Sequence, residues 1–203
     1  MIDQQNEAAP LKEAIIESLS DHVIFSRQFL QERKVFLWGV VTDESSREVV
    51  NRLLYLEAQL PGEPNSPGGS VTAGLIICDT IRMMASPVYT ICMGMAASMG
   101  AIILSVGQKG QRSIFPSGEV MIHQPGIGGN MQGKAIDIEI QARQIIKSKQ
   151  LSARLLAENC GHPMEKILRD FDRDYWMDAQ EAISYGIVDR LADGKRIGSI
   201  AKT

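Results

Sequence analysis

The chain has 203 residues, a length that suits one domain, or one domain with an extra arm, and its composition of 44% hydrophobic and 22% charged residues is that of a soluble protein with a core. A formal net charge of −3 and a pI near 5.7 argue against nucleic-acid and anionic-membrane surfaces, because both need a basic stripe. Residues 1–10 lack a signal-peptide pattern, and no apolar run approaches the ~20 residues that cross a bilayer, so we expect a cytoplasmic protein. Three scattered cysteines and no Cys/His cluster of ligand spacing predict that it holds no metal.

Strands and helices are expected to alternate, which predicts an α/β layer protein with largely parallel strand pairing. In chain order, the predicted elements are an N-terminal arm at 1–33 with a weak helix at 11–19, a strand at 35–41, a helix from 42 to about 60, a turn-rich loop at 61–69, a helix at 71–84, a strand at 88–93, a helix at 98–107, a strand at 119–123, a glycine-rich segment at 125–133, a long helix at 134–159, helices at 164–171 and 178–185, and a strand at 187–191.

The stretch Gly-Met-Ala-Ala-Ser-Met-Gly at 94–100 places Ser98 where an apolar strand runs into an apolar helix. A nucleophilic serine needs such a tight turn, which exposes its hydroxyl, and small neighbours, which admit a substrate carbonyl. Small-x-Ser-x-small strings also occur at ordinary turns, so this stretch alone leaves both interpretations open.

Two further segments carry groups that would complete a hydrolytic site. In Asn65-Ser66-Pro67-Gly68-Gly69-Ser70, adjacent glycines would free backbone amides, and those of Gly69 and Met99 would make a two-donor oxyanion hole. His123 ends an apolar strand, where open α/β sheets usually place their sites, and its side chain suits a general base. A capping turn and a structural histidine are the respective alternatives.

A third member of the site should be a carboxylate that orients the imidazole. The tract Asp170-Phe171-Asp172-Arg173-Asp174 offers three, and spacing alone does not choose among them.

Several of these segments together resemble the ClpP family, the proteolytic subunits of the Clp protease. The resemblance covers residues 26–192 in the family's order, and it rests on the stretches NSPGGSVTAG (65–74), GMAASMGA (94–101), MIHQP (121–125), DIEIQAR (137–143) and DRDYWM (172–177), followed by Glu181-Ala182 and Tyr185-Gly186.

The resemblance implies a role for each matching residue. By motif, Ser98 would be the nucleophile, His123 the general base and Asp174 the acid, with Asp170 and Asp172 as weaker matches. Gly69 and Met99 would be the oxyanion donors. The residues that would line the substrate cleft are Gly68, Pro125, Gly126, Ile127 and Gly128.

The resemblance also implies an architecture and partners. The fold would be a ClpP/crotonase-like superhelix of repeated ββα turns with a protruding strand-helix handle at about 125–159. Residues 1–25 would form an axial arm, 26–192 the peptidase domain and 193–203 a tail. Two heptameric rings would stack into a tetradecamer, fed by an AAA+ unfoldase such as ClpX, ClpA or ClpC. That partner would use the ATP, so this chain would need no cofactor.

Three segments depart from the family pattern. Where the family has a strand before Asn-Ser-Pro-Gly-Gly, residues 59–64 read Gln-Leu-Pro-Gly-Glu-Pro, which is no β-type run, so we expect that strand to be missing. The segment at 126–131 is slightly longer, as in divergent paralogues that assemble with a second ClpP-like subunit. The arm before Phe25 differs from the family's loop that faces the unfoldase.

These observations predict a serine endopeptidase that hydrolyses unfolded proteins and peptides through an acyl-enzyme. One alternative is a catalytically weak or inactive ring subunit beside an active paralogue, motivated by the missing strand. Another is a crotonase-type acyl-CoA enzyme, which also uses two amides as an oxyanion hole but would not need the Ser-His-Asp set.

Overall fold

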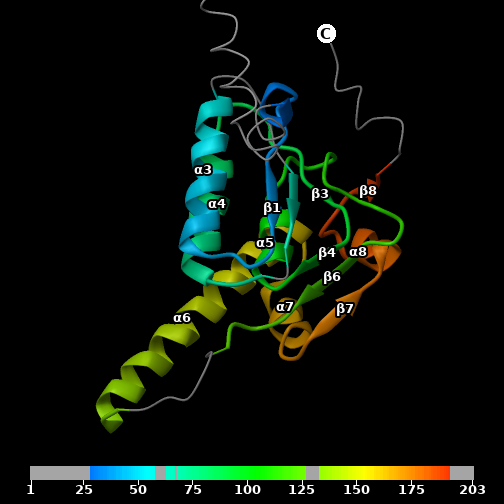
Figure 1. The fold of residues 1–203 in the computed structure, drawn as a ribbon. Coiled ribbons are helices and arrows are strands. Elements are labelled where there is room, and N and C mark those ends of the chain that lie inside the picture. The colour runs from blue at the N-terminus through cyan, green and yellow to red at the C-terminus, as the bar shows by residue number, and fades with distance from the viewer. Residues whose placement is uncertain (1–27, 58–62, 67, 127–132, 193–203) are drawn as a thin grey trace, which may run out of the picture.

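The computed structural model describes residues 28–57, 63–66, 68–126 and 133–192 (Figure 1). The predicted arm helix at 11–19 and the tail at 193–203 lie outside these ranges. The helices are α3 (Asp43–Glu57), α4 (Val71–Met83), α5 (Met99–Ser105), α6 (Ala135–Cys160), α7 (Met164–Asp170) and α8 (Ala179–Tyr185). The strands are β1 (Phe36–Trp38), β2 (Glu63–Asn65), β3 (Ile91–Cys92), β4 (Met95–Ala97), β5 (Ser113–Ile114), β6 (Glu119–Ile122), β7 (Tyr175–Met177) and β8 (Arg190–Leu191).

The strands form three small sheets with the orders β1-β2, β3-β5-β8 and β4-β6-β7. Every named pair is parallel except β6 with β7, so the prediction of an α/β protein with largely parallel pairing is confirmed. The prediction of a single strand at 88–93 is wrong in extent, because β3 covers only Ile91–Cys92 and a second strand, β4, follows it. The chain turns at residues 93–94, which separates β3 from β4, and it is β4 that runs into the helix after Ser98.

The expectation of a missing strand before Asn65 is wrong. β2 is present and pairs in parallel with β1, with Leu37 opposite Pro64 and Trp38 opposite Asn65. An isolated bridge joins Ser66 to Ala96, so this segment lies between β1 and β4. Sheet pairing is made by backbone groups, and a proline removes only one donor, so a short strand forms here without an apolar run in its sequence.

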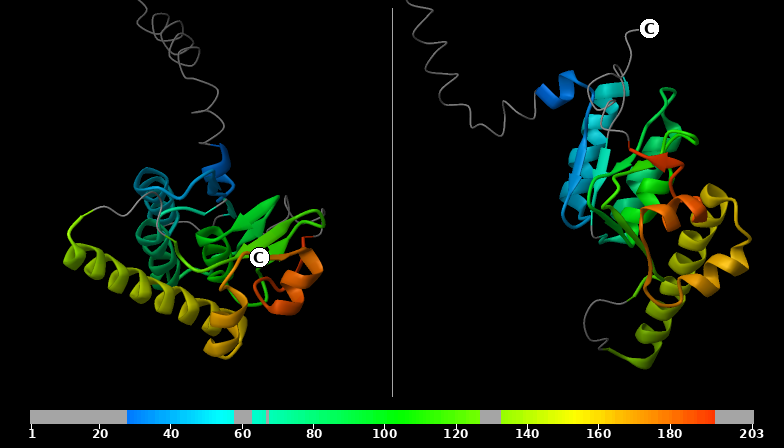
Figure 2. Two further views of the ribbon diagram at one scale, coloured as in Figure 1. Left: turned by 90° about the horizontal axis from the view of Figure 1, so that it is seen from below. Right: turned by 90° about the vertical axis from the view of Figure 1, so that its right-hand side faces the viewer.

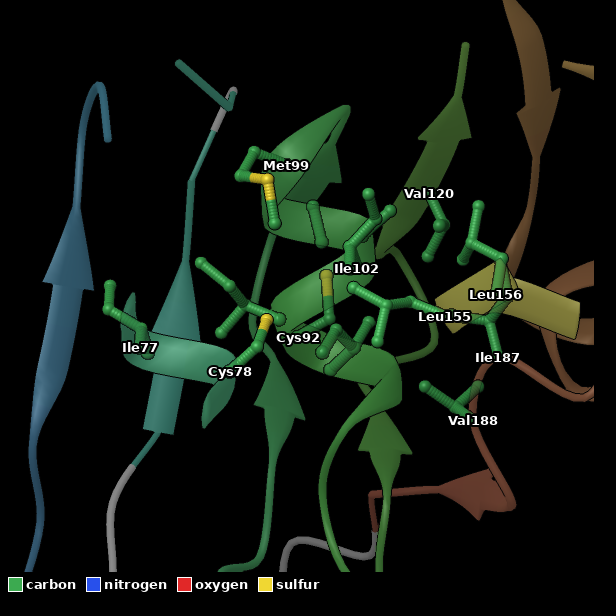
Figure 3. Close-up of a cluster of buried hydrophobic side chains, with 14 of the residues drawn as sticks. Ile77, Cys78, Cys92, Met99, Ile102, Val120, Leu155, Leu156, Ile187 and Val188 are labelled. Atoms are coloured by element: carbon green, nitrogen blue, oxygen red, sulfur yellow. The ribbon is translucent and has the colours of Figure 1, made fainter. Parts of the chain in front are cut away.

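The core surrounds α5, whose residues are all buried. A helix that is apolar on every side has to lie in the interior, and neighbouring elements cover this one. Figure 3 shows Met99 and Ile102 of α5 among side chains from α4, β3, β6 and α6. Because Met99 follows Ser98 directly, this packing also anchors the candidate nucleophile.

Helix α6 divides into two parts along its length. Its second half is packed on the body through Ser152, Ala153, Leu155 and Leu156, whereas its first half projects away from the body (Figure 1, Figure 2). Along the first half, Ile136 and Ile140 are exposed. None of the helices in the described ranges combines the length and the apolar character needed to cross a membrane.

Candidate active site

Ser98 occupies a sharp turn between β4 and α5. Its φ of 55° and ψ of −120° put it among the few non-glycine residues with positive φ in the described part of the chain. Such a conformation is strained and persists only where the surroundings impose it. The Ser98 amide donates to the Met121 carbonyl at 2.7 Å, and the Ala101 amide donates back to the Ser98 carbonyl at 3.1 Å. These hydrogen bonds hold the backbone on both sides of Ser98, which fixes where its side chain leaves the main chain.

His123 follows the last residue of β6, the strand next to β4. The parallel register sets Ala97 opposite Met121, so the residues that follow these strands emerge at the same edge of the sheet. There the His123 Nε2 atom lies 2.7 Å from Ser98 Oγ. The imidazole is one-third exposed, so a substrate has access to it.

Asp174 precedes β7, which runs antiparallel on the other side of β6 (Figure 1). The register pairs Ile122 with Tyr175, so the next positions along it are His123 and Asp174. The His123 Nδ1 atom lies 3.0 Å from Asp174 Oδ1. An ionised carboxylate only accepts hydrogen bonds, so Nδ1 carries the proton and Nε2 accepts from the Ser98 hydroxyl.

The other two carboxylates of the acidic tract bind different groups. Asp170 accepts from Lys166 and from the Tyr185 hydroxyl. Burial alone would raise the pKa of Asp170, but the hydrogen bonds from Lys166 and Tyr185 outweigh it and lower that pKa. Asp172 accepts from the Gln124 side chain at 3.1 Å. Of the three candidates, the structure brings only Asp174 to His123.

The loop that would supply the oxyanion hole is held close to Ser98. A Cβ on Gly68, whose φ is +92°, would lie 2.6 Å from the Ser98 Cβ. On the other side, the Val41 amide donates to the Gly68 carbonyl and the Ser70 amide donates to the Val41 carbonyl. Among the described residues, the amides of Gly69 and Met99 donate no hydrogen bond to another protein group. Neither amide therefore has to give up a protein acceptor in order to bind another oxygen.

Sequence reasoning gave no role to Ser66, which supports this loop. Ser66 is buried; its hydroxyl donates to the Gly39 carbonyl at 2.7 Å and accepts from the Gly68 amide at 3.1 Å. A serine two residues before a glycine turn is typical of side-chain-to-backbone turns, which is the signal that could have revealed it.

Of the predicted cleft residues, Gly68 lies against the nucleophile, and Pro125 and Gly126 lie two and three residues after His123. Ile127 and Gly128 lie outside the described residues, as does most of the lengthened 126–131 segment.

The cysteines offer no competing nucleophile. Burial raises the pKa of Cys78 to about 12 and that of Cys92 and Cys160 to about 11. A thiol with such a pKa stays protonated near neutral pH and reacts slowly. In the described part of the chain, no cluster of His, Cys, Asp and Glu side chains is suited to a metal ion.

An α/β fold that carries a hydrogen-bonded Ser-His-Asp constellation at one sheet edge is typical of serine hydrolases. The model of the Clp protease family matches residues 18–195 of this chain. The chain therefore belongs to the Clp protease family, and its mixed α/β architecture agrees with that family's fold.

Proposed function

We propose that this chain is a serine endopeptidase, the proteolytic subunit of an ATP-dependent protease. The observation that carries the proposal is the unbroken chain of hydrogen bonds from Ser98 through His123 to Asp174, with distances of 2.7 and 3.0 Å. A serine hydroxyl is a weak nucleophile unless a base accepts its proton, and this arrangement supplies the base.

The reaction follows from the roles that this geometry allows. His123 takes the Ser98 proton as the oxygen attacks a peptide carbonyl, and Asp174 stabilises the imidazolium that forms. The amides of Gly69 and Met99 would donate to the oxyanion, each such donor being worth about 3 kcal/mol. His123 then gives its proton to the leaving amine, and water hydrolyses the acyl-enzyme. None of these steps requires a metal or an organic cofactor.

Family membership supports the proposed assembly. Clp proteases generally form rings that pair with AAA+ unfoldases. By that analogy this chain would form stacked seven-membered rings, alone or with a second ClpP-like subunit, and an unfoldase would deliver unfolded substrate. The alternative of an inactive ring subunit rests on the expectation that a strand before Asn65 is missing. Because β2 is present, that alternative loses its support.

The test is covalent labelling of Ser98 with a fluorophosphonate, located by peptide mass spectrometry in protein confirmed to be assembled. Phosphonylation forms an Oγ–P bond, releases fluoride and needs the activated serine. Ser98→Ala should abolish labelling, and His123→Ala should slow it at least about 10³-fold. Ser184→Ala, which alters an exposed serine on α8, is the matched control and should label normally. Assembled wild-type protein that does not label would favour the inactive ring subunit.

A further inference from the structure

The segment that carries Asp174 has little support of its own. Between Phe171, which is fully buried, and Tyr175, which starts β7, residues 172–174 are exposed. The Asp174 side chain is 61% exposed. In the described part of the chain, the imidazole of His123 is the only group that hydrogen-bonds to its carboxylate. Other residues must therefore restrict this segment if Asp174 is to stay in place.

Gln124 contacts this segment at two successive residues. Its backbone amide donates to the Phe171 carbonyl at 2.6 Å. Its side-chain amide donates to the Asp172 carbonyl at 2.8 Å and to Asp172 Oδ1 at 3.1 Å. One residue next to the base therefore ties β6 to the backbone that leads to the acid.

We propose that Gln124 is a positioning residue, whose side-chain amide keeps Asp174 in register with His123. The inference rests on the proposed function and deepens it, because it assigns the group that holds the acid in place. The register of β6 and β7 fixes Tyr175 from one side, and Gln124 fixes Asp172 from the other. With both ends held, the intervening residues have little freedom to turn the carboxylate away. A displacement of about 1 Å in such a constellation is enough to slow the reaction up to about 100-fold.

The backbone hydrogen bond to Phe171 is kept in every side-chain variant at position 124, which makes the side-chain contribution separable. Gln124→Met keeps the length of the side chain and removes both donors. Gln124→Ala removes them without adding an apolar group. Gln180→Met is the matched control, since it makes the same exchange at an exposed glutamine on α8. The second-order rate constant of Ser98 labelling by the fluorophosphonate is the first readout.

We expect Gln124→Met and Gln124→Ala to slow labelling about tenfold and to lower kcat for a fluorogenic peptide with little change in KM. Gln180→Met should match the wild type, and thermal melting should show all three variants folded. A loss confined to KM would overturn the proposal, because it would assign Gln124 to substrate binding.

The decisive measurement repeats the exchange without the acid. Asp174→Asn alone should slow labelling by about 10⁴-fold. If Gln124 acts through Asp174, adding Gln124→Met to that variant should cost less than twofold. The same tenfold loss in both backgrounds would overturn the proposal and assign a general structural role. If wild-type protein labels and Gln124→Met labels equally fast, the proposal fails while the proposed function stands; if wild-type protein does not label, the function itself fails.

Discussion

At the scale of single residues, the site depends on the close approach of two backbone segments, one at Gly68 and one at Ser98. Ser98 has a positive φ, and the space beside it is occupied by the Gly68 backbone. A side chain at position 68 would meet the Ser98 Cβ at 2.6 Å and the Ala97 carbonyl oxygen at 2.8 Å. Glycine is therefore required here by contact as well as by conformation.

Gly68→Ala should slow Ser98 labelling at least about 100-fold, because the added methyl group displaces the turn that carries the nucleophile. The matched control is Gly110→Ala. That glycine has a similar φ of +85°, but an added Cβ would meet nothing within 4 Å. The control variant has only the conformational penalty of a non-glycine residue at positive φ, about 1 kcal/mol in unfolding free energy, and should label normally. Equal labelling rates for the two variants would contradict the requirement for close contact.

The sequence predicts which residues belong to the candidate site better than it predicts how they are arranged. The local patterns around Ser98 and His123, a small-residue turn and a strand end, made both residues candidates, but each pattern alone left a structural interpretation open, and only the combination of motifs favoured the site. The acidic tract was different, since spacing alone left three carboxylates, and only the family resemblance favoured Asp174. The physical reason for that choice is the β6-β7 register, a long-range antiparallel pairing that local patterns do not encode.

At the scale of elements, the predicted helices were located well and the short strands poorly. Helices α4 and α6 have capping and periodicity signals, and their ends fall within one or two residues of the prediction. Strand β2 includes Pro64, and β5 spans only two residues, so neither has a run long enough to show a period of two. These strands form because neighbouring strands present unpaired backbone groups to them. Those neighbours are distant in the sequence, so the local residue pattern does not predict the pairing.

One buried ion pair joins several of these elements. Arg112, which is 2% exposed, donates to both oxygens of Asp189 and to the carbonyls of Ser105 and Asn159. It thereby connects β5, the end of α5, the end of α6 and the residue before β8. Burial alone would raise the pKa of Asp189, but the hydrogen bonds from Arg112 outweigh it and lower that pKa.

Asp189→Asn should reduce the unfolding free energy by about 3 kcal/mol near pH 7, because it leaves the Arg112 charge buried without its counter-ion. A lowered folded-state pKa gives stability that is full above the unfolded value of about 3.9 and is lost as the pH falls through the folded value. The gap between variant and wild type should therefore narrow in acid. Urea unfolding at a fixed protein concentration measures it at each pH.

The control for this pair is Glu139→Gln, which breaks the exposed contact between Glu139 and Arg143 on α6. Exposed pairs contribute little, so this change should stay below about 0.5 kcal/mol at every pH. If the difference in unfolding free energy between Asp189→Asn and the wild type does not vary with pH, the Asp189 carboxyl has the same pKa in the folded and unfolded states, which would contradict the prediction.

At the scale of the whole molecule, many large apolar side chains face outward. They include Trp38 at 59% exposed, Met83 at 87%, Ile136 at 57% and Ile140 at 60%. Single exposed apolar residues are common. So many exposed large apolar side chains, around the body and along one projecting helix, are typical of a subunit that buries such side chains against copies of itself. The first half of α6 projects from the body (Figure 2), and the buried residues of this helix all lie in its second half.

If the first half of α6 forms the contact between stacked rings, a charge in its apolar stripe should separate the rings. Ile136 and Ile140 lie one helical turn apart on the same face, so Ile140→Lys would put an ammonium group into a desolvated contact. We expect analytical ultracentrifugation to show particles of half the wild-type mass. Gln141→Lys, which adds the same charge about 100° around the helix, should leave the full assembly intact. An unchanged mass for Ile140→Lys would place the ring-to-ring contact elsewhere, and equal dissociation by both variants would indicate general charge repulsion instead of a specific apolar seam.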